Sequence, residues 1–271
     1  SFVTDALEMR HDDRVSTHET PRAGGVRARA RAQFMADLLA VARRRLASDG
    51  PAGLSLRAVA RDLGVSSSAV YRYVESRDAL LTALIIEAYD EVGAVCERAL
   101  RESFASGASP ARTWLAVGHA FRAWALDNRA SFELVYGTPI PGYAAPQDTV
   151  AAAARLWGVV EAVCSTALAR GELDPPPVAL EVDGLMSESV MGFAREHVVV
   201  VGPDGEALQH DVIELDEALV ARSVTLWVSL VGAVSAELFG HLHGMTSDHP
   251  RLFEHTLATA AAGVGLRVEA P

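Results

Sequence analysis

The sequence predicts an all-α protein, with a small three-helix domain first and a larger helical domain after it. Apolar residues recur at helical spacing along most of the chain, whereas alternating Val, Ile and Thr runs between turn signals are scarce. Half of the 271 residues are hydrophobic, which suffices for one large core or two smaller ones. We therefore expect a flexible N-terminal segment over residues 1–23, a first domain over 24–76 and a second over 77–271.

Three helices are predicted in the first domain. Apolar residues at helical spacing indicate the first helix, and Asp49-Gly50-Pro51 ends it. Ser55 is a suitable N-cap for the second helix, and Gly64-Val65 forms a tight turn before the third. The expected bounds are about Arg27–Ala47, Leu56–Leu63 and, starting from Ser66 or Ser67, an end near Tyr73.

The second domain is predicted to be a series of longer helices. The stretch Ser106–Pro110 looks like a linker after the first of them, and the run His197–Val201 fits either a helix end or a brief extended segment. The expected bounds are about Arg77–Phe104, Pro110–Asn128, Ala130–Tyr136, Asp148–Arg170, Pro177–His197, Asp216–Leu242 and His249–Val264.

The charge distribution singles out the first domain. The whole chain carries −11, which argues against a protein that coats nucleic acid. Eleven arginines and four acidic residues give residues 22–77 a net charge of +7, so the remainder carries −18. A basic module on an acidic body is typical of a localised phosphate-binding surface.

Targeting and redox signals are scarce. No apolar run reaches the roughly 18 residues that a membrane helix needs without a charge, and residues 1–22 lack the basic-then-apolar layout of a secretory signal. Cys96 and Cys164 lie among apolar residues, which favours small core residues over a redox pair. We therefore expect a cytoplasmic protein without a membrane segment.

The residues from Ser55 to Tyr73 predict a helix-turn-helix. Small Ala60 lets two helices cross closely, and Gly64 suits the left-handed backbone of a tight interhelical turn. A recognition helix enters the major groove with its N-terminal residues leading, where short hydroxyl side chains can approach phosphates and base edges. The polar face of the third helix consists of Ser67, Ser68, Tyr71 and Arg72.

This segment resembles the DNA-binding domain of the tetracycline-repressor (TetR) family. That family usually has Lys where this chain has Arg77, and Phe where it has Val74; Arg77 can still contact a phosphate. Beyond the segment the likeness is architectural, a long all-helical C-terminal body. The likeness covers roughly residues 29–84 and rests on the runs Gly64–Ser66, Ala69–Tyr73 and Ser76–Leu81.

The resemblance implies where DNA would be contacted. Ser55 and Arg57 would meet the DNA backbone, and Tyr73 and Arg77 would meet phosphates, although Tyr73 could instead be partly packed core. The side chains at the groove would be Ser66, Ser67, Ser68 and Tyr71, and Arg72 on the same polar face is expected to contact DNA as well. Before them, Arg27, Arg29 and Arg31 form either an arm toward phosphate or the minor groove, or a solvated run.

The aromatic residues of the second domain fit either simple core packing or an apolar small-molecule cavity, and the family resemblance favours the cavity. Few charges lie among them, so we expect a hydrophobic or aromatic effector, with the loop Gly137–Tyr143 gating entry. The expected lining residues are Phe121, Trp124, Phe132, Tyr136, Trp157, Met186, Val190 and Phe193.

A homodimer is expected to form through residues 216–264. The helix Asp216–Leu242 is apolar almost all round, so another surface should cover it, unless it is the central core helix of a monomer. Two-fold symmetry would place two recognition helices about one DNA turn apart, roughly 34–36 Å, on an approximately palindromic operator.

Taken together, these features predict a ligand-responsive transcriptional regulator that binds double-stranded operator DNA. Because repression is the commoner mode in the TetR family, we expect it to be a repressor. Effector binding would move the helix Arg77–Phe104 as a lever. The alternatives are a helical scaffold that does not bind DNA and an enzyme with an unrecognised site. We find no nucleotide-binding glycine loop, nucleophile elbow or HExxH motif, and the histidines at 241, 243, 249 and 255 lack the pattern of a metal site. Catalytic residues, metals and cofactors are therefore not expected.

Overall fold

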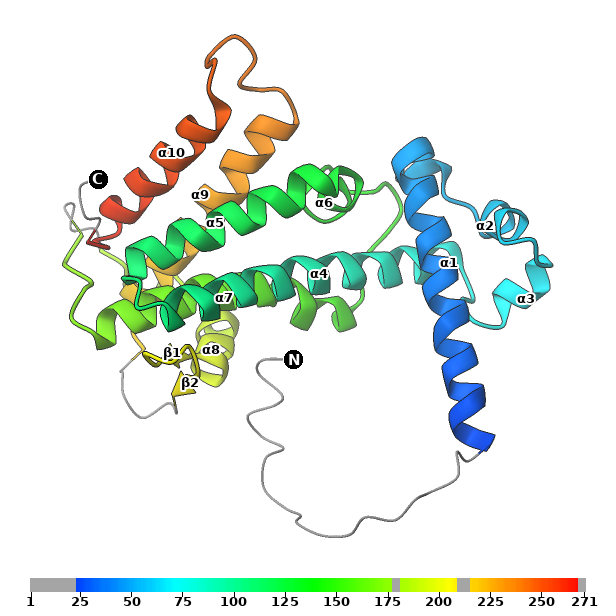
Figure 1. Cartoon of the computed structure of the whole chain (residues 1–271), viewed down its shortest axis with the longest axis horizontal. Coiled ribbons are helices and arrows are strands. Elements are labelled where there is room, and N and C mark those ends of the chain that lie inside the picture. Colours follow the sequence, from blue (N-terminus) through cyan, green and yellow to red (C-terminus); the bar gives the residue numbers. More distant parts are fainter. Residues whose placement is uncertain (1–22, 177–180, 209–214, 268–271) are drawn as a thin grey trace. The chain divides into compact units, whose positions relative to one another are not determined.

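The structure is a computed structural model that describes residues 23–176, 181–208 and 215–267. The all-α prediction is confirmed, because helices dominate the described residues and the strands β1 and β2 are two residues long each (Figure 1). The predicted flexible segment lies outside the described residues up to Arg22.

The chain divides into two compact units. The first unit contains the residues up to Glu87 together with Thr138–Pro146, and the second contains Ala88–Gly137 and the residues from Gln147 onward. Helix α4 (Arg77–Ala105) therefore contributes residues to both units.

The first unit holds α1 (Ala23–Gly53), α2 (Leu56–Asp62), α3 (Ser67–Tyr71) and the start of α4. Helix α1 begins four residues before the expected Arg27, and its helical backbone breaks at Gly50, where φ is 69° and ψ is 176°. The predicted stop signal therefore acts at the expected place. Buried apolar residues join the helices, among them Leu38, Val59 and Val70.

The second unit is built around α7, which packs against α5, α9 and β1, while α10 packs against α5 and α9 (Figure 1). Strand β1 pairs antiparallel with β2 across a short turn, so the run after His197 is extended. The bounds are α5 Pro110–Asp127, α6 Arg129–Tyr136, a 3-10 turn Gln147–Thr149, α7 Val150–Ala169, α8 Glu188–His197, β1 Val200–Val201, β2 Ala207–Leu208, α9 Glu217–Leu238 and α10 His249–Gly263.

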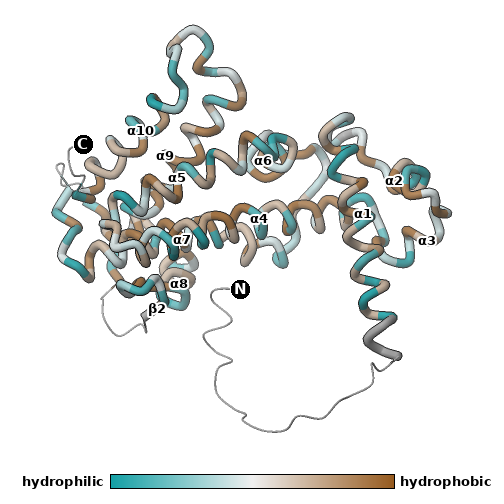
Figure 2. The backbone as a smooth tube through the Cα atoms, in the orientation of Figure 1, coloured by the Kyte–Doolittle hydropathy of each residue, from teal (hydrophilic) through white to brown (hydrophobic). Residues whose placement is uncertain are grey.

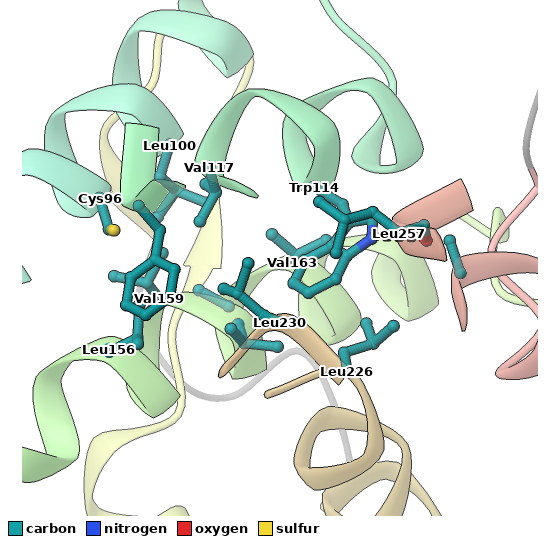
Figure 3. Packing of buried hydrophobic residues seen from close by; sticks show 14 of the residues in the cluster. Cys96, Leu100, Trp114, Val117, Leu156, Val159, Val163, Leu226, Leu230 and Leu257 are labelled. Carbon is teal, nitrogen blue, oxygen red and sulfur yellow. Dashed lines mark hydrogen bonds between the residues drawn. The ribbon is translucent and has the colours of Figure 1, made fainter. Parts of the chain in front are cut away.

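The main core of the second unit joins α4, α5, α7, α9 and α10 (Figure 3). Figure 2 shows hydrophobic and hydrophilic residues alternating along its helices, as expected where one face is buried. The Trp114 indole donates a hydrogen bond to the Leu257 carbonyl at 2.9 Å, and a side chain at Gly118 would clash with Leu257. Helices α5 and α10 therefore pack closely. Cys96 and Cys164 are both buried in this core.

Ion pairs also fix helices of the second unit. The Arg155 guanidinium on α7 donates to both carboxylate oxygens of Glu97 on α4, each at 2.9 Å, and to Asp90 at 2.7 Å. Arg122 on α5 donates to Glu237 on α9 at 2.7 Å. Both arginine–glutamate pairs are bidentate, a geometry that holds the two partners in one orientation.

One predicted helix is wrong in its first half. Residues 177–180 of the expected helix Pro177–His197 lie outside the described residues, and α8 begins only at Glu188. Residues before it form a turn in which Gly184 has a φ of 72°, a left-handed value that interrupts a helix.

Two helices, residues 147–169 and 217–238, are long and apolar enough to cross a membrane by length and composition alone. Buried core helices pass the same criterion, and these two pack against each other.

Candidate nucleic-acid interface and effector site

Helices α2 and α3 form the predicted helix-turn-helix. Ser55 is the N-cap of α2 but its side chain makes no capping hydrogen bond. Gly64 has a φ of 69°, so the turn uses the left-handed backbone that glycine adopts without strain. Ser66 is the N-cap of α3, and its hydroxyl accepts from the backbone N–H of Ala69 at 3.3 Å.

Helix α3 buries one side and exposes the other. Val70 is fully buried and Val74 is 4% exposed, so these two side chains fix the helix on the first unit. On the opposite side Tyr71 is 48% exposed, and Ser68 and Arg72 are exposed as well. Such an exposed aromatic ring among short hydroxyl and cationic groups is suited to contact a polar surface. Of the other serines, Ser66 shares a hydrogen bond with Ser68 at 3.0 Å, and Ser67 is partly exposed.

Tyr73 has a packing role that the sequence left open. Its ring lies 4.3 Å from the ring of Phe34 on α1, and the Arg31 guanidinium lies 5.2 Å from its centroid. The side chain remains partly exposed. Tyr73 therefore links the residues just after α3 to α1, and its ring attracts the Arg31 guanidinium of α1.

Arg77 is engaged within the first unit. Its guanidinium donates to the Pro51 carbonyl at 2.7 Å and to the Leu54 carbonyl at 3.2 Å, and lies 3.5 Å from the Asp78 carboxylate. These contacts tie the start of α4 to the connection between α1 and α2. The expected phosphate contact would have to be made while these donors are in use.

The other basic residues of the first unit differ in whether their side chains are paired within the protein or exposed to solvent. Arg45 donates to both oxygens of Asp62, at 2.6 and 3.0 Å, and thereby lowers the pKa of that carboxyl. This pair fixes α1 to α2, and nothing in the sequence pattern had indicated it. Arg57 is exposed on α2. Among the described residues of the first unit, the exposed arginines are Arg27, Arg29, Arg31, Arg44, Arg57, Arg61 and Arg72.

The predicted effector-lining residues fall into two groups. In the first group, on α5 and α6, the Phe121 ring lies 5.7 Å from Tyr136, 6.1 Å from Phe132 and 6.4 Å from Trp124. Phe121 and Phe132 are fully buried in the main core. These four residues therefore come together as one aromatic cluster.

Two polar atoms in the aromatic cluster lack partners. The indole nitrogen of Trp124 and the hydroxyl of Tyr136 are buried without a hydrogen-bond partner among the described residues. Burial also raises the pKa of Tyr136, so its hydroxyl stays protonated and can donate. Buried donors in native proteins usually have partners, so a molecule with acceptor atoms would complete both.

The second group lies apart, between α7, α8 and α9. Met186, Val190 and Trp157 pack around the buried Met191, and Phe193 lies 5.7 Å from Trp157. All four predicted members of this group are only partly buried. The structure therefore does not join the eight predicted lining residues into one set.

The predicted gating loop belongs mostly to the first unit. Residues Thr138–Pro146 cluster with it, and the Tyr143 hydroxyl shares a hydrogen bond with the Thr82 hydroxyl of α4 at 2.9 Å. Gly137 stays with the second unit, directly after Tyr136. The loop therefore follows the last residue of the aromatic cluster in the sequence, and its hydrogen bond to Thr82 lies within the first unit.

Glu161 on α7 was missed by the sequence reasoning. It is 2% exposed and lies in a helix whose residues are mostly apolar. Its carboxylate accepts a hydrogen bond from the Ser165 hydroxyl. Burial raises its pKa to about 7. A lone acid within the run Val159-Val160-Glu161-Ala162-Val163 was the signal that could have found it.

Two family models match this chain. Residues 38–84 match the bacterial regulatory proteins of the tetR family, and residues 114–260 match the tetracyclin repressor-like C-terminal domain. Among curated proteins, the HTH-type transcriptional regulator Rv1816 of Mycobacterium tuberculosis is 36% identical over 223 residues, which cover 80% of this chain and 85% of that protein. Regulator Mb1846 of Mycobacterium bovis matches to the same extent.

Solved structures agree with the fold. The crystal structure of SCO4313, described as a regulatory protein, has a TM-score of 0.62 and 30% identity and covers 89% of this chain and 98% of its own. A tetR-family regulatory protein from Rhodococcus RHA1 has a TM-score of 0.53 and 16% identity, with 86% of this chain and 97% of its own covered. At that identity the likeness concerns the fold alone.

Proposed function

The chain belongs to the TetR family of transcriptional regulators, and on this basis we propose that it is a cytoplasmic repressor that binds double-stranded operator DNA as a homodimer. The exposed side of α3 carries the proposal. Tyr71 is 48% exposed while Val70 next to it is fully buried, so the helix is fixed on the protein and its polar side is available to a major groove.

The residues around α3 suit the remaining contacts. Arg72 is exposed beside Tyr71, and Ser66, Ser67 and Ser68 lie at the N-terminus of the helix, where short hydroxyls can reach base edges and phosphates. Ser55 and Arg57 on α2 would contact the DNA backbone. Tyr73 and Arg77 would act mainly by fixing the positions of α1, α2 and α4 around the recognition helix.

Fluorescence anisotropy with DNA that flanks the gene itself tests this proposal. We expect salt-dependent binding by the wild type, and a loss of roughly 1–3 kcal/mol for Tyr71→Ala if it reads a base. Arg72→Ala should weaken binding and lower the salt slope by about 1 if it meets a phosphate. The matched control is Arg129→Ala, which removes an exposed arginine from the second unit. If the wild type shows no salt-dependent affinity for this DNA, the proposal fails.

A hydrophobic or aromatic effector would bind at the aromatic cluster of Phe121, Trp124, Phe132 and Tyr136. The two buried donors without partners support this place over the second group, and they favour an effector with acceptor atoms. The effector can lower operator affinity only if it binds one conformation of the protein more tightly than another.

Operator affinity measured with a panel of phenols, aromatic ketones and aromatic acids tests the effector site. We expect at least one compound to weaken DNA binding, and Tyr136→Phe to reduce that response. Tyr89→Phe is the control, because the Tyr89 hydroxyl donates to the Val135 carbonyl at 3.2 Å and is not available. Unchanged operator affinity with every compound would count against the proposed response.

A further inference from the structure

A second group of aromatic side chains in the second unit lies next to a buried carboxyl group, that of Glu161. Two contacts show that residues 193–201 run parallel to α7. The rings of Trp157 and Phe193 lie 5.7 Å apart, and the backbone N–H of Val201 donates to the Thr166 hydroxyl at 2.9 Å. Glu161 therefore lies one helical turn beyond Trp157, on the same side of α7.

The Glu161 carboxyl is incompletely satisfied. One oxygen accepts from the Ser165 hydroxyl, whereas the other, Oε2, has no hydrogen-bond partner among the described residues, although the side chain is only 2% exposed. Carboxylate oxygens buried without a donor are unfavourable, so native proteins seldom keep one without a compensating ligand or role. An incoming donor would remove this deficit, and a cationic donor would also neutralise the charge.

The neighbouring aromatic side chains remain partly accessible. The His197 imidazole stacks on Phe193 with centroids 4.0 Å apart and planes 12° apart, and its Nδ1 donates to the Phe193 carbonyl at 2.9 Å. The Trp157 indole is fixed by its hydrogen bond to the Ser223 hydroxyl at 3.1 Å. Trp157, Phe193 and His197 are all partly exposed, in contrast to the fully buried Phe121.

We propose that Trp157, Glu161, Phe193 and His197 form a binding site for a small aromatic amine. The ring of the amine would lie against Trp157 and Phe193, and its ammonium group would donate to Glu161 Oε2. Charge complementarity selects this class, because an aromatic acid would be repelled by the ionised carboxyl, and the hydroxyl of a neutral aromatic alcohol could donate to Oε2 but would leave the negative charge uncompensated. Aromatic faces also attract a cation, which adds to the preference.

The site is separate from the aromatic cluster around Phe121, and the proposal concerns binding alone. It therefore does not depend on whether the chain binds DNA or responds to an effector.

Isothermal titration of the full chain with phenethylamine, phenethyl alcohol and hydrocinnamate tests the proposal. In buffer of about pH 8, where most of Glu161 is ionised, we expect the amine to bind at least about tenfold more tightly than the alcohol, with the acid weakest. Equal affinities for amine and alcohol, tighter binding of the acid, or no binding of the amine at millimolar concentration would each overturn it.

Two variants locate the site. Glu161→Gln keeps the size of the side chain and an oxygen for Ser165, so it should remove the preference for the amine while alcohol binding stays unchanged. The control Glu188→Gln removes an exposed acid from α8 and should change neither affinity. Phe193→Leu should weaken the binding of all three compounds alike. This variant locates the site if Glu161→Gln fails to fold. Retention of the amine preference in folded Glu161→Gln would place the amine elsewhere.

Discussion

Glu161 makes the folded state sensitive to pH at the scale of one residue. Burial raises its pKa to about 7, while the hydrogen bond from Ser165 acts in the opposite direction. Because the pKa is higher in the folded than in the unfolded chain, the folded protein binds more protons between the two values. Its contribution to stability is therefore fully present below about pH 4.5 and is lost as the pH rises through about 7.

Replacing Glu161 by Gln should remove this dependence. From pH 4.5 to above 7, the free energy of unfolding of the variant should improve relative to that of the wild type by roughly 3 kcal/mol. Urea unfolding of both proteins across this range measures the difference. Parallel stability curves over the whole range would contradict the assignment of the shift to Glu161.

The recognition helix depends on neighbouring elements more than on its own length. Helix α3 has only five residues, from Ser67 to Tyr71, which is too short to be stable in isolation. It is held by Val70 in the core, by the turn at Gly64 and by Tyr73 against α1. The geometry presented to DNA therefore follows from the turn and from α1.

Gly64→Ala should destabilise the first unit through the turn. Among the described residues, no neighbouring atom lies within 4 Å of a methyl group added at Gly64, so the cost comes from its φ of 69°, about 1–2 kcal/mol. Gly158→Ala is the matched control in α7, also with open space, and should stabilise by roughly 0.5–1 kcal/mol. Thermal unfolding measures the change in stability for both variants, and operator titration measures the effect on DNA binding. Equal stability changes for the two substitutions would contradict this explanation of the turn.

The sequence predicted the elements whose signals are local. The turn at Gly64, the N-cap at Ser55, the start of the third helix and most helix bounds of the second unit depend on neighbouring residues, and most bounds agree with the structure within a few residues. The grouping of the aromatic residues could not be predicted, because Phe, Trp and Met fit a core and a binding site equally well. Likewise the engagement of Arg77 depends on Pro51 and Leu54, which lie more than 20 residues away in the sequence.

At the scale of the whole molecule, α9 supports the proposed dimer. Its fully buried Leu226, Leu230 and Val234 face the core of the second unit, whereas Val228 is 55% exposed. Gly232 is exposed one turn further along on the same side. The described residues of one chain leave this apolar side uncovered, and a second copy would bury it.

Val228→Arg should therefore shift the protein from dimer to monomer. Light scattering after gel filtration measures the mass. Operator affinity should fall by roughly a hundredfold or more, because the two recognition helices of a dimer would no longer bind the operator together. Val150→Arg is the control, since Val150 is 46% exposed on α7. An unchanged dimer mass for Val228→Arg would show that the copies associate elsewhere.

The loop Thr138–Pro146 has a consequence for building hybrid regulators. It belongs to the first unit, although the chain on either side of it belongs to the second, so the polypeptide passes between the units three times. A hybrid that exchanges only the residues up to Glu87 for those of a relative would separate Thr82 from its native partner Tyr143. A graft that carries both segments keeps that pair, and sensor engineering with this scaffold should exchange them together.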